Sequence, residues 1–234
     1  MTRFVISVGG SVLEPTLDTH RLMEWADALK TLVKAGHQVF AVVGGGGEAR
    51  RYINVCRDIG LDEASSDEFG ILITRINARL LLGALGEYAY PRVAESYQDA
   101  KEFGLSGKIV VMGGVTPGQT TDAVAAVLAE ETCASMMINM TAIDGIYTAD
   151  PKKDPNAVKY DTLGPQELID LIMKEKLCAG SNMVIDLVAA KITERSGIPL
   201  VVIDGRDPSL ICRALLDGEF AGTIVGEKAV TFPL

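Results

Sequence analysis

Short apolar runs rich in β-branched residues alternate along the chain with longer stretches in which apolar residues recur at helical spacing. The apolar runs predict buried strands, at Phe4–Val8, Gln38–Val43, Lys108–Met112, Ser135–Met140 and Pro199–Asp204. The intervening stretches predict helices, from Asp18 or Thr19 to Lys34, over residues 48–60, from Ser66 to about residue 85, and over residues 120–131, 165–176 and 183–196. This alternation is typical of an α/β fold, a three-layer αβα sandwich with a mainly parallel central sheet.

Turn residues mark several boundaries between these elements. Gly36 and Gly197 stand just after helical patterns, where glycine commonly ends a helix. Asp144 and Gly145 predict a tight hairpin turn. Neither a repeat nor a linker interrupts the chain, which therefore predicts a single domain over residues 1–234.

The composition narrows the chemistry that such a fold can support. The 234 residues include 31 acidic and 22 basic side chains, which gives a formal net charge of −9. The pI near 4.8 argues against a protein whose main task is to grip nucleic acid through its phosphates. Only two histidines are present, His20 and His37, and neither stands in a zinc-binding spacing. A His-rich zinc site and a Ser-His-Asp hydrolase are therefore both disfavoured.

The cysteines and the apolar runs predict a cytoplasmic protein. Four cysteines lie far apart and form no C-x-x-C motif, so we expect reduced thiols that pack as small apolar side chains, at Cys56, Cys133, Cys178 and Cys212. The N-terminal residues lack the form of a signal peptide, and no run approaches the ~20 apolar residues of a membrane span. We therefore expect no membrane partner.

Three glycine-rich loops each follow a predicted buried strand and precede a helix. They span residues 9–11, 44–47 and 113–122. In an open α/β sheet, loops at the carboxyl ends of the strands line the crevice where ligands bind. Glycine lets backbone N–H groups approach an anion closely, and a helix N-terminus adds a favourable dipole. One such loop is also what a tight turn requires, but three in one chain predict ligands that carry several phosphates.

The second loop also matches a dinucleotide-binding fingerprint, with Asp67 at about the distance of a ribose contact. That fingerprint normally belongs to the first strand, which here has a glycine loop of its own. Arg50 and Arg51 follow the second loop, and adjacent arginines suit bidentate phosphate binding better than hydride transfer. The Walker motif and the protein-kinase H-R-D and D-F-G motifs are absent from the sequence. Any phosphoryl transfer must therefore use a different scaffold.

Six sequence motifs, taken in order, resemble those of a known family. They read VGGS, VVGGGGEAR, ITRINA, MGGVTPGQTTDAVAA, DGIYTADPKKDP and GSNMVIDLVAAK. This series resembles the amino-acid kinase superfamily and, within it, the archaeal uridylate kinases. The likeness extends from Phe4 to Gly226. DG-x-Y-T-A-D-P is shared by several branches, whereas TPGQTTDA together with T-R-x-N-A is more specific to the kinases of nucleoside monophosphates.

The resemblance implies a fold, a reaction and an assembly. The fold would be the amino-acid kinase (carbamate kinase-like) one, with an eight-stranded sheet, an N-terminal lobe for UMP over about residues 1–133 and a C-terminal lobe for ATP over about 134–234. The reaction would transfer the γ-phosphoryl group of MgATP to UMP, giving ADP and UDP, in pyrimidine nucleotide biosynthesis. Mg²⁺ would arrive with ATP, and the family is typically hexameric, so a homohexamer is expected.

The resemblance also implies roles for individual residues. ATP would be bound by the positions that match the family's donor set, Gly10, Ser11, Gly46, Arg50, Thr141, Tyr147 and Asp150. UMP would be bound by the positions that match its acceptor set, Gly45, Asp67, Val115, Thr116, Pro117, Gly118, Gln119, Thr120 and Thr121. The catalytic candidates are Arg50, which would offset charge, and Asp186, which would organise the site or a water on Mg²⁺ unless it only caps a helix.

Two positions depart from the family pattern. Ser7 stands where many members carry a lysine. The archaeal type also lacks this lysine, which leaves open the cation that replaces it. Arg50 is the first choice and Lys191 the second. Ala142 stands where relatives often have asparagine, so one hydrogen bond to ATP is either missing or made by the backbone.

Two further polar residues have alternative interpretations. Asp122 fits a favourable charge at a helix N-terminus as well as a site residue. Arg75 is expected to be structural or to lie at a subunit contact.

Two other functions stay open at this point. Transfer between two phosphates needs no strong general base, because the acceptor oxygen is already anionic at pH 7, so the scarcity of histidine is compatible with a kinase. One alternative is a non-catalytic protein of the same fold that binds a nucleotide or an oxyanion. The other is a kinase for another small acceptor, such as isopentenyl phosphate or an amino acid. Isopentenyl phosphate kinases are expected to place a histidine beside the acceptor phosphate, and neither His20 nor His37 is placed for that.

Overall fold

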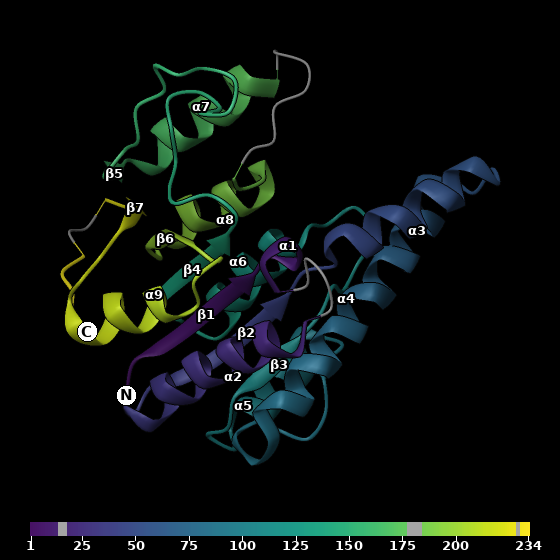
Figure 1. Ribbon diagram of the computed structural model, residues 1–234, viewed down its shortest axis with the longest axis horizontal. Helices are drawn as coiled ribbons and strands as arrows, with labels where there is room; N and C mark the ends of the chain where they lie inside the picture. Colours follow the sequence, from purple (N-terminus) through teal and green to yellow (C-terminus); the bar gives the residue numbers. More distant parts are fainter. Residues whose placement is uncertain (14–17, 177–183, 228–229) are drawn as a thin grey trace.

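The computed structural model describes residues 1–13, 18–176, 184–227 and 230–234. Within them, seven strands form one sheet in the order β3-β2-β1-β4-β6-β7-β5 (Figure 1). The strands are β1 Arg3–Val8, β2 Gln38–Val43, β3 Val110–Met112, β4 Met136–Thr141, β5 Thr162–Leu163, β6 Leu200–Asp204 and β7 Gly222–Val225. Every neighbouring pair is parallel except β6 and β7. The prediction of a mainly parallel sheet is confirmed, with seven strands in the described residues where the family likeness implies eight.

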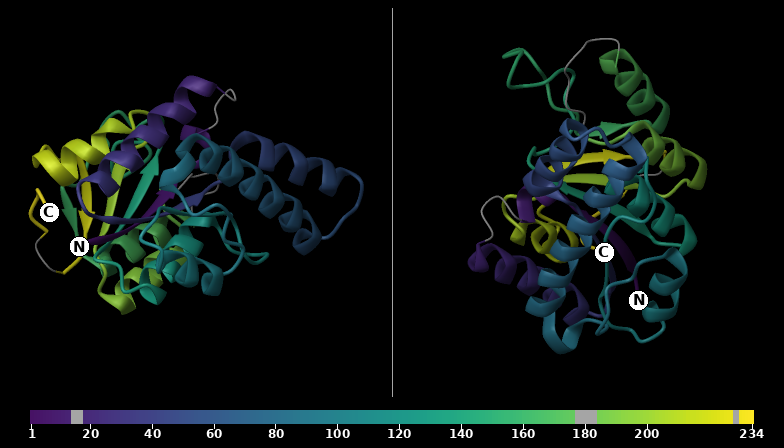
Figure 2. Two further views of the ribbon diagram at one scale, coloured as in Figure 1. Left: turned by 90° about the horizontal axis from the view of Figure 1, so that it is seen from below. Right: turned by 90° about the vertical axis from the view of Figure 1, so that its right-hand side faces the viewer.

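Helices cover both faces of this sheet (Figure 2). They are α1 Gly10–Leu13, α2 Thr19–Lys34, α3 Gly46–Asp58, α4 Glu63–Leu85, α5 Tyr97–Gly104, α6 Thr121–Glu131, α7 Pro165–Lys176, α8 Leu187–Ser196 and α9 Ser209–Cys212, with a 3₁₀ turn Gly86–Tyr88 and a π-turn Arg213–Asp217. Side chains of a strand point alternately to its two faces, so β1 serves two cores. Phe4 and Ile6 pack with α2, α4 and α9, whereas Val5 packs with α5 to α8. The three-layer αβα prediction is confirmed.

Several predicted boundaries agree with the structure. The Asp18 carboxylate accepts a hydrogen bond from the His20 backbone N–H at 3.0 Å and caps α2. Gly36 follows the end of α2 with a φ of +91°. Gly197 caps the C-terminus of α8 in the left-handed conformation, which glycine adopts without strain.

Two helices begin later or earlier than predicted in the described residues. α4 begins at Glu63, because Asp62 rather than Ser66 caps it by accepting from the Ser65 backbone N–H at 2.9 Å. α8 begins at Leu187, and the predicted start at Met183 lies outside the described residues.

Asp144 and Gly145 do not make a hairpin turn. β4, which precedes them, pairs with parallel neighbours on both sides. Gly145 instead adopts a φ of +152° where the backbone passes Thr223. A Cβ at Gly145 would lie 2.7 Å from the Thr223 hydroxyl oxygen. Close approach of two segments, and not a strand reversal, explains this glycine.

The thiols agree only in part with the expected packing. Cys56 is buried, Cys212 is half-buried and Cys133 is exposed, and all three are free. Cys133 departs from the prediction because it lies in the turn after α6 with a φ of +50°. Cys178 lies outside the described residues.

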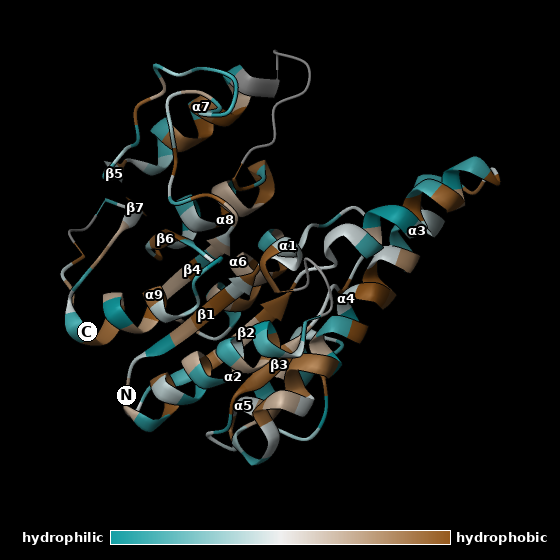
Figure 3. Ribbon diagram, viewed as in Figure 1, coloured by the Kyte–Doolittle hydropathy of each residue, from teal (hydrophilic) through white to brown (hydrophobic). Residues whose placement is uncertain are grey.

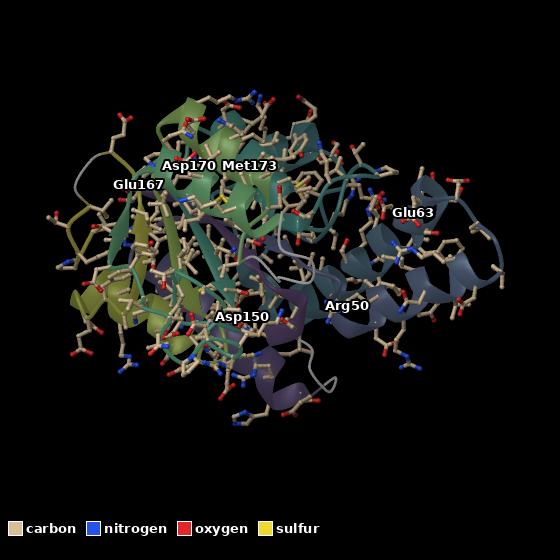
Figure 4. The ribbon with its side chains drawn as sticks, turned by 90° about the horizontal axis from the view of Figure 1, so that it is seen from above. Arg50, Glu63, Asp150, Glu167, Asp170 and Met173 are labelled. Carbon is tan, nitrogen blue, oxygen red and sulfur yellow. The ribbon has the colours of Figure 1, made fainter. Side chains whose placement is uncertain are left out.

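α3 and α4 pack against each other as a helical hairpin that extends away from the sheet (Figure 1). We call residues 46–85 the arm. Figure 4 shows Arg50 where the arm meets the body and Glu63 near its far end. The base of the arm therefore lies beside the carboxyl ends of β1 and β2, where the glycine loops are.

Candidate active site

The first two glycine loops meet backbone to backbone where β1 and β2 end. Val8 pairs with Val43 in the sheet, and the Gly44 N–H donates to the Val8 carbonyl at 2.9 Å. A Cβ on Gly10 would lie 2.0 Å from the Gly46 nitrogen, and one on Gly44 would lie 2.5 Å from the Gly10 nitrogen. Only glycine permits this approach. The two loops therefore form one rigid backbone surface at the start of α1 and α3.

A cavity of about 350 Å³ lies between this backbone surface, the arm and the third glycine loop. It brings together most of the predicted donor-side and acceptor-side residues, which are Gly10, Ser11, Gly45, Gly46, Arg50, Asp67, Thr116, Gln119, Thr120 and Thr121. Among the predicted residues, Val115, Pro117 and Gly118 belong to the same loop without lining the cavity, and Thr141, Tyr147, Asp150 and Asp186 lie beyond its lining. Residues that sequence reasoning did not select complete the walls, chiefly Ile53, Gly70, Ile71 and Thr74.

Arg50 is the cation of this cavity. It lies in the first turns of α3, is exposed and lines the cavity. Neighbouring Arg51 points its charge elsewhere, because its guanidinium pairs with Glu48 at 2.7 Å. The described residues offer Arg50 no carboxylate within ion-pair distance. Its charge is therefore available to an anion in the cavity, which the helix N-terminus also favours.

The third loop is held from two sides. The Asp67 carboxylate, on α4, accepts from the Gly118 backbone N–H at 2.7 Å. Thr120 caps α6 by accepting from the Ala123 N–H at 3.1 Å, and its hydroxyl donates to the Asp186 carboxylate. Asp67 thus shapes the loop that carries the predicted acceptor-side residues from Val115 to Thr121.

Asp186 does two things in the structure. It caps α8 by accepting from the backbone N–H groups of Val188 and Ala189 at 2.7 and 3.0 Å. The same carboxylate accepts a hydrogen bond from Thr120, which is 66 residues away in the sequence. The helix-capping interpretation is therefore correct, and the capping carboxylate also touches the cavity-lining loop.

Asp122 belongs to a polar network that sequence reasoning left undecided. It accepts a hydrogen bond from the Ser7 hydroxyl at 2.7 Å, and Ser7 is fully buried. Burial raises the pKa of Asp122 to about 6; the bond from Ser7 opposes this rise and the charge of Asp186 adds to it. Ser7, which replaces the family's lysine, therefore satisfies this carboxylate without neutralising it.

The alternative cation, Lys191, is engaged elsewhere. Its ammonium pairs with Glu194 one turn along α8 at 3.0 Å on the surface, and it does not line the cavity. The geometry favours Arg50 as the cation for the cavity.

Asp122 gives the first testable prediction. The carboxyl has an ordinary pKa of 3.8 and one of about 6 in the fold, so the folded state binds the extra proton between these pH values. Its contribution to stability therefore falls as pH rises from about 4 to 7, and Asp122→Asn removes this loss. Chemical denaturation at several pH values measures the free energy of unfolding of both proteins. The value for Asp122→Asn minus that for wild type should rise by at most about 3 kcal/mol from pH 4 to pH 7. A difference that does not change with pH would contradict this account.

The residues predicted for the base and sugar of ATP lie at the end of β4 and in the loop that follows it. Thr141 ends β4, and its carbonyl accepts from the Gly205 N–H at 2.7 Å. The Tyr147 hydroxyl donates to Asp144 at 2.9 Å. The Asp150 carboxylate accepts from the Lys152 N–H at 3.0 Å (Figure 4). Thr141 ends β4, and Tyr147 and Asp150 lie in the segment that follows it. Their contact with ATP stays a prediction.

Arg75 has a structural role, one of the two expected for it. Its guanidinium pairs with the Glu95 carboxylate at 2.8 Å and donates from Nε to the Gly114 carbonyl at 3.3 Å.

Comparison with known proteins identifies the family. The model of the amino acid kinase family matches residues 2–204. The chain belongs to the amino acid kinase family. That span of the family model runs from β1 through β6 and contains all three glycine loops and every residue of the candidate site.

Relatives and solved structures agree with this membership. The chain is 80% identical to the uridylate kinase of Methanocorpusculum labreanum over 100% of both chains. It is 54% identical to the uridylate kinase of Methanoculleus marisnigri, over 99% of this chain and 98% of that one. The crystal structure of uridylate kinase from Archaeoglobus fulgidus superposes with a TM-score of 0.85 at 45% identity, and the match covers 97% of this chain and 100% of that chain.

Proposed function

We propose that this amino acid kinase is a uridylate kinase, which transfers the γ-phosphoryl group of ATP to UMP and gives ADP and UDP. The observation that carries the proposal is the one cavity in which all three glycine loops converge with Arg50, which has no acidic partner among the described residues. We infer that the acceptor is UMP because the full-length relatives are named uridylate kinase.

The cavity suits an in-line transfer between two phosphates. The N–H groups of Gly10, Ser11 and Gly46 would hold the phosphates of ATP, because these residues line the cavity at the N-terminal ends of α1 and α3. The third loop and Asp67 would hold UMP from the other side. The acceptor oxygen is anionic already, so the chain needs to align the phosphates and offset their repulsion. Arg50 would stabilise the negative charge on the group in transfer.

Mg²⁺ would accompany ATP. The described residues hold no group of three or more candidate metal ligands, which fits an ion held mostly by phosphate oxygens and water. Asp186, whose carboxylate accepts from the cavity-lining Thr120 hydroxyl, is the side chain that would hold a water of its shell. When bound, Mg²⁺ would offset charge on the β- and γ-phosphates.

An acceptor panel tests this function. Purified protein with MgATP should release ADP in a UMP-dependent manner, at a rate well above that with CMP, dUMP, isopentenyl phosphate or glutamate. No UMP-dependent release would overturn the proposal, and release with isopentenyl phosphate alone would favour the other kinase class. The structure disfavours that class, because His20 pairs with Glu24 on the surface at 3.3 Å and neither histidine lines the cavity.

We further propose a homohexamer that uses the outer face of α4. Leu72, Ile76 and Leu80 follow one another at four-residue spacing and are 54%, 55% and 41% exposed. Figure 3 shows hydrophobic positions along α4, including the part of the helix that extends beyond the sheet. The stripe is symmetric about Ile76, so two antiparallel copies that cross there would place Leu72 of one protomer on Leu80 of its partner, as an isologous contact requires.

The same face has a second physical interpretation. By length and composition alone, Glu63–Tyr88 could cross a membrane. Arg75, Arg79 and Glu95 line the groove beside the stripe, however, and charged groups at that position suit a protein partner in water. We propose a cytoplasmic protein with neither a membrane nor a nucleic-acid partner.

Ile76→Glu tests the contact. The change places two like charges at the crossing point and should lower the oligomeric state in sedimentation velocity. Leu105→Glu is the control, because Leu105 is 89% exposed and lies after α5. An unchanged hexamer in Ile76→Glu would contradict the contact, as would a protein that is monomeric without any substitution.

A further inference from the structure

One face of α4 contacts both the second and the third glycine loop. Asp67, Thr74 and Asn77 are spaced seven and then three residues apart, which puts them on the same side of the helix. Thr74 and Asn77 are buried polar residues of the T-R-x-N motif, 7% and 3% exposed, and the proposed function gives neither of them a role. Buried polar side chains are costly unless they make hydrogen bonds, so their partners indicate what they do.

Thr74 fixes the start of the third loop. Its hydroxyl oxygen accepts from the Gly114 backbone N–H at 2.7 Å and donates to the Ile71 carbonyl at 2.6 Å. Arg75 bonds the carbonyl of the same Gly114 at 3.3 Å. A Cβ at Gly113 would lie 2.7 Å from the Thr74 hydroxyl oxygen, so the loop has no room to move toward the helix. Both polar groups of residue 114 are therefore held by α4.

Asn77 fixes the second loop from one turn further along. Its side-chain amide donates to the carbonyls of Gly44 and Gly45 at 3.0 and 3.4 Å. Gly44 and Gly45 both line the cavity, so a bond to their carbonyls fixes the orientation of their peptide groups at the cavity wall. α4 thus touches the loop proposed to hold donor phosphates and the loop proposed to hold the acceptor.

We propose that Thr74, Arg75 and Asn77 are positioning residues. They set the separation between the second glycine loop (residues 44–47), which we call the donor loop, and the third (residues 113–122), which we call the acceptor loop. The proposal rests on the proposed function for the names of the two substrates. The three side chains hydrogen-bond to backbone groups of the glycine loops, so their loss shifts loop position. Thr74 and Arg75 act on the acceptor side, and Asn77 acts on the loop that the two substrates share.

Thr74→Val and Thr74→Ser form a matched pair. Valine keeps the shape of threonine and loses the hydroxyl, whereas serine keeps the hydroxyl. Thr74→Val should raise the KM for UMP about tenfold, with the KM for ATP within about twofold of wild type, because a buried donor loses its acceptor on one side of the site only. Thr74→Ser should restore the KM for UMP to near the wild-type value.

Thr193→Val is the control for a general effect of this substitution. Thr193 is also buried in a helix, 5% exposed, and its hydroxyl bonds only to carbonyls of its own helix, at Ala189 and Ala190. It should leave both KM values unchanged. Arg75→Met, compared with Arg57→Met at the exposed Arg57–Glu63 pair, gives a second test on a half-buried residue if Thr74→Val does not fold.

Hydrogen exchange separates this proposal from the proposed function. The Gly114 amide should be protected in wild type and in Thr74→Ser, and should exchange faster in Thr74→Val, whichever acceptor the enzyme uses. Unchanged Gly114 exchange, or faster exchange with an unchanged acceptor KM, would overturn the positioning role. Wild-type protein without UMP-dependent turnover would overturn the proposed function, while the exchange result would still decide whether Thr74 holds the loop.

Discussion

Gly10→Ala is expected to abolish measurable turnover and to destabilise the fold. A Cβ at this position would lie 2.0 Å from the Gly46 nitrogen and 2.7 Å from the Gly44 carbonyl carbon. Both are backbone atoms, so no side-chain rotation relieves the clash and the two loops must separate. We expect a loss of about 3 kcal/mol in the free energy of unfolding and of more than about 100-fold in kcat/KM, because phosphates held by displaced loops are out of line.

Gly47→Ala is the matched control. Gly47 directly follows Gly46, the residue that Gly10 contacts, in the first turn of α3, and a Cβ on Gly47 meets nothing within 4 Å. We expect alanine to be tolerated and to stabilise the helix by about 0.5–1 kcal/mol. Denaturant unfolding and steady-state kinetics on both variants check the pair. Equal behaviour of the two variants would show that the loops are not in tight contact.

Arg50→Ala is expected to lower kcat/KM by about 100- to 1000-fold while the protein stays folded. Arg50 is exposed at the cavity and has no acidic partner among the described residues, so its removal breaks no ion pair. Alanine also favours the helix. The loss arises from charge that develops during phosphoryl transfer, where an arginine contributes effects of this size. Steady-state kinetics together with a thermal melt measures both quantities.

Arg51→Ala tests whether the effect depends on the position of the Arg50 charge or only on the total positive charge of α3. Arg51 follows directly in α3, yet it pairs outward with Glu48 at 2.7 Å. An exposed pair of this kind contributes less than about 1 kcal/mol. Kinetic constants near those of wild type are expected. A similar loss in both variants would mean that the overall positive charge of α3, and not the position of Arg50, supports catalysis.

The central strands could be predicted from sequence because they are buried on both faces. Every residue of β2 is buried. A short, continuous apolar run of this kind is typical of a strand in the middle of a parallel sheet. The strands that were missed are short and lie at the far side of the sheet. β5 has two residues and β7 has four, so their hydrogen bonds depend on partners distant in sequence.

The candidate site was predictable where backbone carries the chemistry. Glycine loops after buried strands are local signals, and their meeting follows from parallel pairing of β1 and β2. The role of Asp122 was not predictable in this way. Its contact with Ser7 joins residues 115 positions apart, and the rise in its pKa depends on burial. Thr74 and Asn77 were visible only as part of a motif, because their partners are backbone groups of other loops.

Asp144 and Gly145 are a case in which a local signal predicted a turn that the fold does not contain. The pair is a strong hairpin signal in isolation, and the parallel environment of β4 overrides it. Gly145 is required for close approach to Thr223, a contact that no local pattern indicates. Tertiary packing decided the conformation there.

The fate of the γ-phosphoryl group tests the central claim most directly. A single-turnover experiment with ATP labelled in the γ-phosphate, UMP and excess enzyme should place the label in UDP, with little in inorganic phosphate, and Arg50→Ala should slow its appearance. Label in inorganic phosphate alone would show that water, and not a nucleotide, occupies the acceptor side of the cavity. Label that remains in ATP would show that the site binds nucleotide without transferring phosphate.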